Sequence, residues 1–122
     1  MEMVGLLRDS FGLDARCEVL EAAPIRLLPD ALDNLYRISQ EAVSNARRHG
    51  RAQSIKITLE SAAAVVRLAI EDDGSGIPQP PPATGMGLKI MQFRAATMGA
   101  RLSISPGERG GTCVSVECVQ AQ

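Results

Sequence analysis

The chain has 122 residues, enough for one domain with a buried core, and its formal net charge of −1 gives no electrostatic bias towards nucleic acid or an anionic membrane. Apolar residues make up 45% of the sequence and aromatic residues only 2%, so aliphatic side chains and methionine must fill the core. No apolar run approaches the roughly 20 residues needed to cross a bilayer, and no signal peptide opens the chain. We therefore expect a single domain over residues 1–122 that contacts neither nucleic acid nor membrane.

The three cysteines, Cys17, Cys113 and Cys118, are odd in number and lack the CxxC spacing of many metal and redox sites. We expect buried free thiols in a reducing compartment rather than a disulfide or a metal centre. The expected compartment is the cytoplasm, whether or not the full-length protein is anchored in a membrane.

A helical segment and a short strand come first in the chain. Residues 1–11 have apolar side chains at helical spacing but no N-terminal cap, so we interpret residues 1–12 as the remnant of a helix that begins upstream. Residues 16–21 read as a short strand in front of the loop at Pro24.

A long helix is predicted from Pro29 to His49. Pro29 and Asp30 suit the first helical turn, where proline needs no N–H partner and an acidic side chain caps free N–H groups; Gly50 suits the end. Its apolar residues fall within one broad sector, as expected for a helix packed on a sheet. They are Leu28, Leu32, Leu35, Ala42, Val43 and Ala46.

Alternating apolar residues predict two strands after this helix, around residues 54–60 and 66–70. The second strand runs into an acidic, glycine-rich segment, which a proline-rich loop at residues 78–84 follows. Such a loop can be neither helix nor inner strand.

A second helix opens with residues 85–87 and ends at Gly99, with Leu88, Met91, Ala95 and Met98 as its apolar stripe. Alternation at residues 102–104 and 114–116 predicts a closing hairpin. The order of elements predicts an α+β fold: a two-layer sandwich with helices on one face of a mixed, mainly antiparallel sheet.

Glu41, Asn45 and Arg48 form a polar row on the long helix, roughly opposite its apolar sector. The helix alone favours an ordinary solvated face. Asparagine is, however, a poor helix former, so it is less expected there than lysine or glutamine. An amide oxygen can ligate Mg²⁺, and a carboxylate one turn earlier can orient or deprotonate a nucleophile. The row is therefore a candidate metal–phosphate site.

Two glycine segments follow. In residues 72–76, Asp-Asp-Gly-Ser-Gly, the glycines let backbone approach a flat ligand, and a carboxylate can accept a hydrogen bond from an amine such as adenine N6. In residues 85–88, Gly-Met-Gly-Leu, free N–H groups and the positive end of the helix dipole favour phosphate. Each segment alone could be a turn or a flexible helix start, and the second matches neither a P-loop nor GxGxxG.

Taken together and in this order, the segments resemble the Bergerat-type ATP-binding fold shared by gyrase, MutL mismatch-repair proteins, heat-shock chaperones and histidine kinases. The resemblance covers about residues 29–119. Residues 41–49 look like the N box of that superfamily, and residues 72–76 and 85–88 look like its two glycine boxes.

Finer details are similar to the catalytic domains of sensor histidine kinases, in the subgroup that signals to helix-turn-helix response regulators. They are the run over residues 87–100, the short lid at residues 77–84 and Gly110-Gly111-Thr112. The lid departs from the family pattern in being unusually rich in proline, and it contains no recognisable F box.

The resemblance implies ATP and Mg²⁺ as ligands. It implies that Glu41 and Asn45 are the catalytic residues, with Glu41 near the γ-phosphate and Asn45 ligating Mg²⁺, and that Asp72 reads adenine. The other implied nucleotide-binding residues are Arg48, His49, Gly74, Gly76, Ile77, Gly85, Met86, Gly87, Leu88 and Thr112.

His49 is the only histidine, and we do not expect it to be the phosphoacceptor. In-line transfer needs an acceptor that approaches the γ-phosphate from outside, whereas His49 follows Asn45 on the same helix. The resemblance therefore implies transfer to a histidine on a separate phosphoacceptor and dimerisation domain of the same full-length kinase, and from there to a response regulator.

Other functions fit the same residues. An anti-sigma-factor-type protein serine kinase is complete at about this length, and a non-catalytic nucleotide-binding module needs no acceptor at all. A standalone ATPase of the gyrase or MutL type is less well supported, because those domains are longer and carry extended lids.

Overall fold

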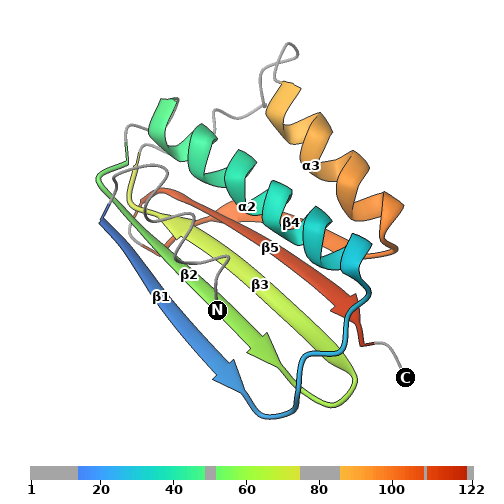
Figure 1. The fold of residues 1–122 in the computed structure, drawn as a ribbon. Coiled ribbons are helices and arrows are strands. Elements are labelled where there is room, and N and C mark those ends of the chain that lie inside the picture. The colour runs from blue at the N-terminus through green and yellow to red at the C-terminus, as the bar shows by residue number, and fades with distance from the viewer. Residues whose placement is uncertain (1–13, 49–51, 75–85, 109, 121–122) are drawn as a thin grey trace.

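The computed structural model describes residues 14–48, 52–74, 86–108 and 110–120 (Figure 1). The helix predicted over residues 1–11 lies outside them. The described elements match the rest of the predicted order, and each predicted helix or strand is found within a few residues of its expected position. They are β1 (Asp14–Glu21), α2 (Pro29–Arg48), β2 (Ser54–Ser61), β3 (Val65–Asp72), α3 (Met86–Thr97), β4 (Arg101–Pro106) and β5 (Thr112–Val119).

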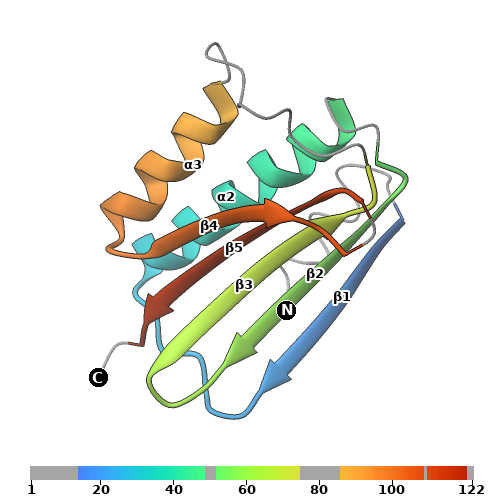
Figure 2. The same ribbon diagram turned by 180° about the vertical axis from the view of Figure 1, so that it is seen from behind.

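The five strands form one sheet in the order β1-β2-β3-β5-β4. β1 runs parallel to β2, and every other neighbouring pair is antiparallel. Helices α2 and α3 lie side by side on one face of this sheet, and the view from behind shows that neither described helix covers the other face (Figures 1 and 2). The predicted fold class, two layers with a mixed and mainly antiparallel sheet, is confirmed.

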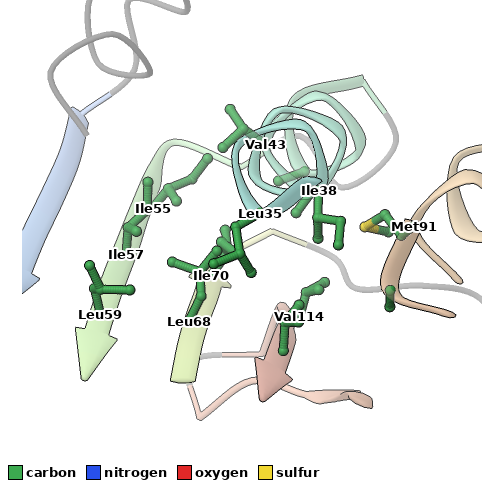
Figure 3. Close-up of a cluster of buried hydrophobic side chains, with 14 of the residues drawn as sticks. Leu35, Ile38, Val43, Ile55, Ile57, Leu59, Leu68, Ile70, Met91 and Val114 are labelled. Atoms are coloured by element: carbon green, nitrogen blue, oxygen red, sulfur yellow. The ribbon is translucent and has the colours of Figure 1, made fainter. Parts of the chain in front are cut away.

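The hydrophobic core lies between the sheet and the two helices (Figure 3). Alternate residues of the central strands point towards the helices, as the period of two along a strand requires. Met91 of α3 is fully buried and faces Ile38 of α2. The inward residues of the central strands are Ile55, Ile57, Leu59, Val66, Leu68, Ile70, Val114, Val116 and Cys118.

One part of the predicted apolar sector of α2 is wrong. Leu28 and Leu32 are 68% and 38% exposed, whereas Ile38, which the prediction omitted, is fully buried. On a helix of about 100° per residue, Leu32 and Ile38 lie on opposite flanks of Leu35. Because α3 covers only the flank of Ile38, that side is buried and the side of Leu32 is left partly open.

The expected free thiols are confirmed for Cys113 and Cys118, whereas the side chain of Cys17 lies outside the described part. Cys118 is buried, but Cys113 is only half-buried because it points to the face of the sheet opposite α2 and α3. Loss of hydration raises the pKa of both thiols, and the neighbouring Glu71 carboxylate raises that of Cys113 further. Both cysteines therefore stay protonated at neutral pH.

Gln120 ties three segments together at the end of the sheet where β2 ends and β3 begins. It is only 6% exposed. Its side-chain oxygen accepts a hydrogen bond from the Arg26 N–H at 2.6 Å, and its amide nitrogen donates to the carbonyls of Pro24 at 2.9 Å and Ala62 at 3.1 Å. All polar atoms of this buried amide are thus used, which fixes the loop that leads into α2.

Asp73 makes a second clamp, at the opposite end of the sheet. Its carboxylate accepts hydrogen bonds from the backbone N–H groups of Gln53 and Ser54, each at 3.0 Å, and from the Ser54 hydroxyl at 3.0 Å. These bonds, those from the backbone of Ser54 and Gln53 first, hold the pKa of Asp73 below its ordinary value. Asp73 therefore joins the end of β3 to the start of β2.

This lowered pKa predicts a pH-dependent contribution to stability. Because the folded chain holds the Asp73 proton more weakly than the unfolded chain, the carboxylate contributes fully above the ordinary value of 3.8. The contribution is lost as the pH falls through the lowered folded value. We expect Asp73→Asn to reduce the free energy of unfolding at pH 7, and expect this difference from wild type to shrink below about pH 4. Urea unfolding at several pH values measures it; an equal difference at pH 7 and pH 3 would contradict the clamp.

Candidate functional site

Asp72 is a buried carboxylate at the end of β3. It follows Leu68 and Ile70 in the strand alternation, so its side chain turns to the helix side of the sheet, and it is only 6% exposed. Its Oδ1 accepts a hydrogen bond from the backbone N–H of Gly74 at 2.8 Å. A buried carboxylate needs such partners because desolvation of the charge is costly. The adjacent Asp73 turns away and serves the clamp, so the two aspartates have different roles.

The start of β5 lies beside Asp72. The register that pairs Glu71 with Cys113 brings Asp72 level with Thr112, which is 7% exposed. Gly111 packs so closely that an added Cβ would overlap the Asp72 backbone oxygen and its Oδ1, and would lie 2.7 Å from the Asp72 carbonyl carbon. Only glycine therefore fits at residue 111, because any side chain there would occupy the space of the Asp72 carboxylate.

Glu41 and Asn45 lie on the flank of α2 that faces α3. That flank is defined by Asn34, whose Oδ1 accepts a hydrogen bond from Arg94 of α3, and by Ile38, which meets Met91 of α3 (Figure 3). On a helical wheel of about 100° per residue, Asn45 falls between Asn34 and Ile38, and Glu41 lies beside Asn34. Both Glu41 and Asn45 are half-buried.

The surroundings of this polar row differ from the solvated face that the helix alone favours. Glu41 and Asn45 are half-buried rather than exposed, because α3 packs along that flank of α2. The solvent-facing residues of the helix include Asp33 and Arg37, which pair at 3.2 Å. The side chain of Arg48 lies outside the described residues.

Asn45 and Asp72 belong to the same end of the fold. The backbone N–H of Ala52 donates to the Ala46 carbonyl at 2.9 Å, which returns the chain from the end of α2 towards β2. β2 then begins beside the end of β3, where Ile55 pairs with Asp72. Figure 1 shows the last turns of α2 above this end of the sheet.

Helix α3 begins at Met86 and runs antiparallel to α2, so its first turn lies towards the same end (Figure 1). Leu88 is half-buried against the core. Gly87 lies in this first turn, and the Met86 side chain lies outside the described part of the chain. The remaining predicted site residues, His49, Gly76, Ile77 and Gly85, lie outside the described part of the chain.

The arrangement offers distinct kinds of contact at one end of the molecule. Asp72 presents a buried acceptor, Glu41 and Asn45 present a carboxylate and an amide on a half-buried flank, and α3 directs its N-terminal end towards this region. A buried acceptor suits an amine on a flat ring, whereas a helix start suits an anion. The residues with described positions thus suit a ligand with one aromatic amine end and one phosphate end.

Several residues that build this region have no clear signal in the local sequence. The roles of Asp73 and Gly111 depend on register, which places residues far apart in sequence side by side. The Arg94–Asn34 bond joins residues 60 positions apart. The Gly110-Gly111-Thr112 segment was a usable signal for Gly111, whereas nothing in the local pattern identifies Asn34.

Among the described residues, no helix is both long and apolar enough to cross a membrane. The same residues contain no cluster of three or more histidine, cysteine, aspartate or glutamate side chains that could hold a metal ion.

The fold is shared with solved histidine kinase structures. The ATP-binding domain of PrrB from Mycobacterium tuberculosis superposes with a TM-score of 0.77 over 99% of this chain and 93% of that one, at 21% identity. The histidine kinase AdeS from Acinetobacter baumannii superposes with a TM-score of 0.76 over 99% of this chain and 64% of that one, at 17% identity. At these identities the likeness establishes the architecture.

Sequence similarity establishes the relationship itself. The sensor histidine kinase LnrJ of Bacillus subtilis is 37% identical over 94 residues, and the nitrate/nitrite sensor protein NarX of Escherichia coli is 31% identical over 117 residues. These matches cover 77% and 85% of this chain but only 22% and 20% of the relatives, so the chain spans about a fifth of their length. The predicted subgroup of sensor kinases fits these relatives.

Residues 30–122 match the family described as histidine kinase-, DNA gyrase B- and HSP90-like ATPase, which includes all three segments on which the resemblance was based. The predicted superfamily is confirmed, and the chain belongs to the histidine kinase-, DNA gyrase B- and HSP90-like ATPase family.

Proposed function

We propose that this domain binds ATP with Mg²⁺ and donates the γ-phosphoryl group to a histidine on a separate phosphoacceptor and dimerisation domain of the same full-length kinase. The observation that carries the proposal is the buried Asp72 carboxylate, which the Gly74 N–H holds and for which Gly111 leaves room, at the end of the sheet where α2 carries Asn45. The phosphohistidine would then pass its phosphoryl group to a response regulator. We place the domain in the cytoplasm, where ATP is available.

Adenine recognition follows from Asp72. One oxygen of its carboxylate is held by the Gly74 N–H, and an ionised carboxylate can only accept hydrogen bonds. The exocyclic amine of adenine donates two, so it can satisfy this buried group. Thr112, level with Asp72, adds a hydroxyl on the same side of the sheet.

Phosphate binding involves the α2 flank and the start of α3. The Asn45 amide oxygen would hold Mg²⁺, and the free N–H groups of the first turn of α3, with Gly87, would face the phosphates. Phosphate and water supply most ligands of nucleotide-bound Mg²⁺. A single amide oxygen is therefore a sufficient ligand from the protein. When bound, Mg²⁺ neutralises charge on the phosphates.

Glu41 lies one turn before Asn45 on the same half-buried flank. It would orient the attacking imidazole nitrogen and accept its proton as the nitrogen–phosphorus bond forms. The bond from the γ-phosphorus to the bridging oxygen breaks, and ADP leaves with that electron pair. Arg48, His49, Gly76, Ile77 and Gly85 remain predicted nucleotide contacts.

Phosphotransfer tests the proposed activity. The domain, incubated with γ-labelled ATP, Mg²⁺ and the phosphoacceptor domain of its own kinase, should give labelled acceptor whose phosphate is lost in acid. Glu41→Gln should slow the transfer at least about a hundredfold, since loss of a general base costs about 10²–10⁴-fold, while ATP binding remains. Acid-stable label would identify a serine kinase instead, and intact binding without transfer would identify a non-catalytic module.

Different residues should contribute to the affinity for the adenine end and for the phosphate end of ATP. We expect Asp72→Asn to weaken ATP binding about tenfold or more, as for loss of a charged hydrogen bond, and to leave binding of tripolyphosphate unchanged. Asn45→Ala should weaken the binding of both ATP and tripolyphosphate, and only when Mg²⁺ is present. Calorimetric titration measures these affinities, with Asp33→Asn on the solvent face of α2 as the control. Equal ATP affinity in wild type, Asp72→Asn and Asn45→Ala would exclude the proposed site.

Gly111 should be needed for affinity because it leaves room for Asp72. Gly111→Ala places a methyl group where the Asp72 carboxylate lies, so we expect ATP affinity to fall about tenfold, with a loss of stability of about 1–3 kcal/mol. Gly99→Ala is the matched control. It adds the same methyl group at a φ of 68° with no atom within 4 Å, so it strains the backbone but should leave affinity unchanged. Thermal unfolding measures the loss of stability, and calorimetric titration measures the ATP affinity. Wild-type affinity in a folded Gly111→Ala variant would contradict the prediction.

A further inference from the structure

We propose that Arg94 of α3 and Asn34 of α2 are a pair of positioning residues that holds α3 at the angle needed for nucleotide binding. This proposal rests on the proposed ATP site. Neither residue belongs to the predicted nucleotide contacts. The pair would act through α3, whose first turn includes Gly87 of the second glycine segment.

The pair is a direct bond between the two helices. The Arg94 guanidinium donates from Nη1 to Oδ1 of Asn34 at 3.2 Å, across 60 residues of sequence, and both side chains are half-buried. The two helices run antiparallel, and Met91 meets Ile38 about one turn away from the bond (Figure 3). Arg94 and Met91 on one helix thus face Asn34 and Ile38 on the other.

Apolar packing alone leaves α3 with some freedom to rotate and slide. Among the described elements α3 packs mainly against α2 and β4, and its fully or nearly fully buried side chains are Met91 and Ala95. Methionine is flexible and adapts to shifted neighbours, and apolar contacts have little directionality. A hydrogen bond from a planar guanidinium to an amide oxygen has a preferred length and angle. It therefore selects one rotation and one height of α3 on α2.

The bond lies away from the proposed phosphate site. Asn34 and Asn45 are eleven residues apart on the same flank of α2, about 16 Å along the helix axis. Arg94 follows Gly87 by seven residues, about 10 Å along α3. A small change in the tilt of α3 at the bond would therefore be magnified at its first turn. A direct contact of Arg94 with phosphate, the other role open to a basic residue, would require Arg94 near Asn45.

The pair should raise affinity by keeping α3 in the binding-competent position before ATP arrives. Apparent affinity falls in proportion to the fraction of molecules in that position. Loss of one such bond would change that fraction, and hence the ATP affinity, by about three- to tenfold.

A double-mutant cycle tests the proposal. We expect Asn34→Ala, Arg94→Ala and the double variant each to weaken ATP binding by the same three- to tenfold, because either single change breaks the one bond. Asn34→Asp, which keeps an acceptor for the guanidinium, should retain wild-type affinity. Arg37→Ala is the matched control. It removes an arginine hydrogen bond of the same 3.2 Å length to Asp33, on the solvent face of α2, and should leave affinity unchanged.

Amide hydrogen exchange without nucleotide gives a readout that does not depend on ATP. The amides of Leu88–Thr97 should exchange faster in Asn34→Ala and Arg94→Ala than in wild type, while those of β3 should not change. Weaker ATP binding in Arg94→Ala but not in Asn34→Ala would overturn the proposal in favour of a direct phosphate contact. Unchanged exchange in α3 would also overturn it. If wild type bound no ATP, the proposed function would fail, and exchange alone would still show whether the pair holds α3.

Discussion

The burial of a carboxylate at the end of β3 is the constraint around which the proposed site is organised. Strand alternation turns Asp72 to the helix side and Asp73 away from it, so two neighbouring residues of the same type meet different surroundings. A buried charge is tolerated only with hydrogen-bond partners. The backbone of Gly74 supplies one, and Gly111, with no side chain, leaves the space in which the carboxylate can lie. The carboxylate can still accept further hydrogen bonds, and an amine of a ligand can donate them.

Helix α2 has three sides with different surroundings, and one of them carries the other residues of the proposed site. Leu35, Ala42 and Ala46 face the sheet, the Asp33–Arg37 pair faces solvent, and the flank between them faces α3. The half-burial of Glu41 and Asn45 follows from that third side. A polar side chain that borders a neighbouring helix keeps fewer rotamers than one in open solvent, and this restriction suits a residue that has to hold a metal ion or orient a nucleophile.

Much of the fold could be predicted from the sequence because its signals are local. Alternation predicts β2, β3 and the closing hairpin, helical spacing predicts α2 and α3, and Asp72 with its following glycines is a candidate site on sequence alone. The errors arose where a neighbour distant in sequence decides the outcome. Ile38 is buried and Leu32 is not because α3 lies on one side of α2, and no pattern within residues 29–48 contains that information. The same holds for Asp73, Gly111 and the Arg94–Asn34 pair, because their partners are also distant in sequence.

The position of β5 has a consequence for how the chain folds during synthesis. This strand comes last in the sequence yet lies between β3 and β4, and Gln120, just after it, fastens the loop at Pro24 and the turn at Ala62. Until β5 leaves the ribosome, β3 has an unpaired edge, and the row formed by Val66, Leu68 and Ile70 is incompletely covered. Such an edge is open to pairing with other chains. We therefore expect incomplete nascent chains of this domain to depend on chaperones, and the finished domain to gain most of its cooperativity in one late step.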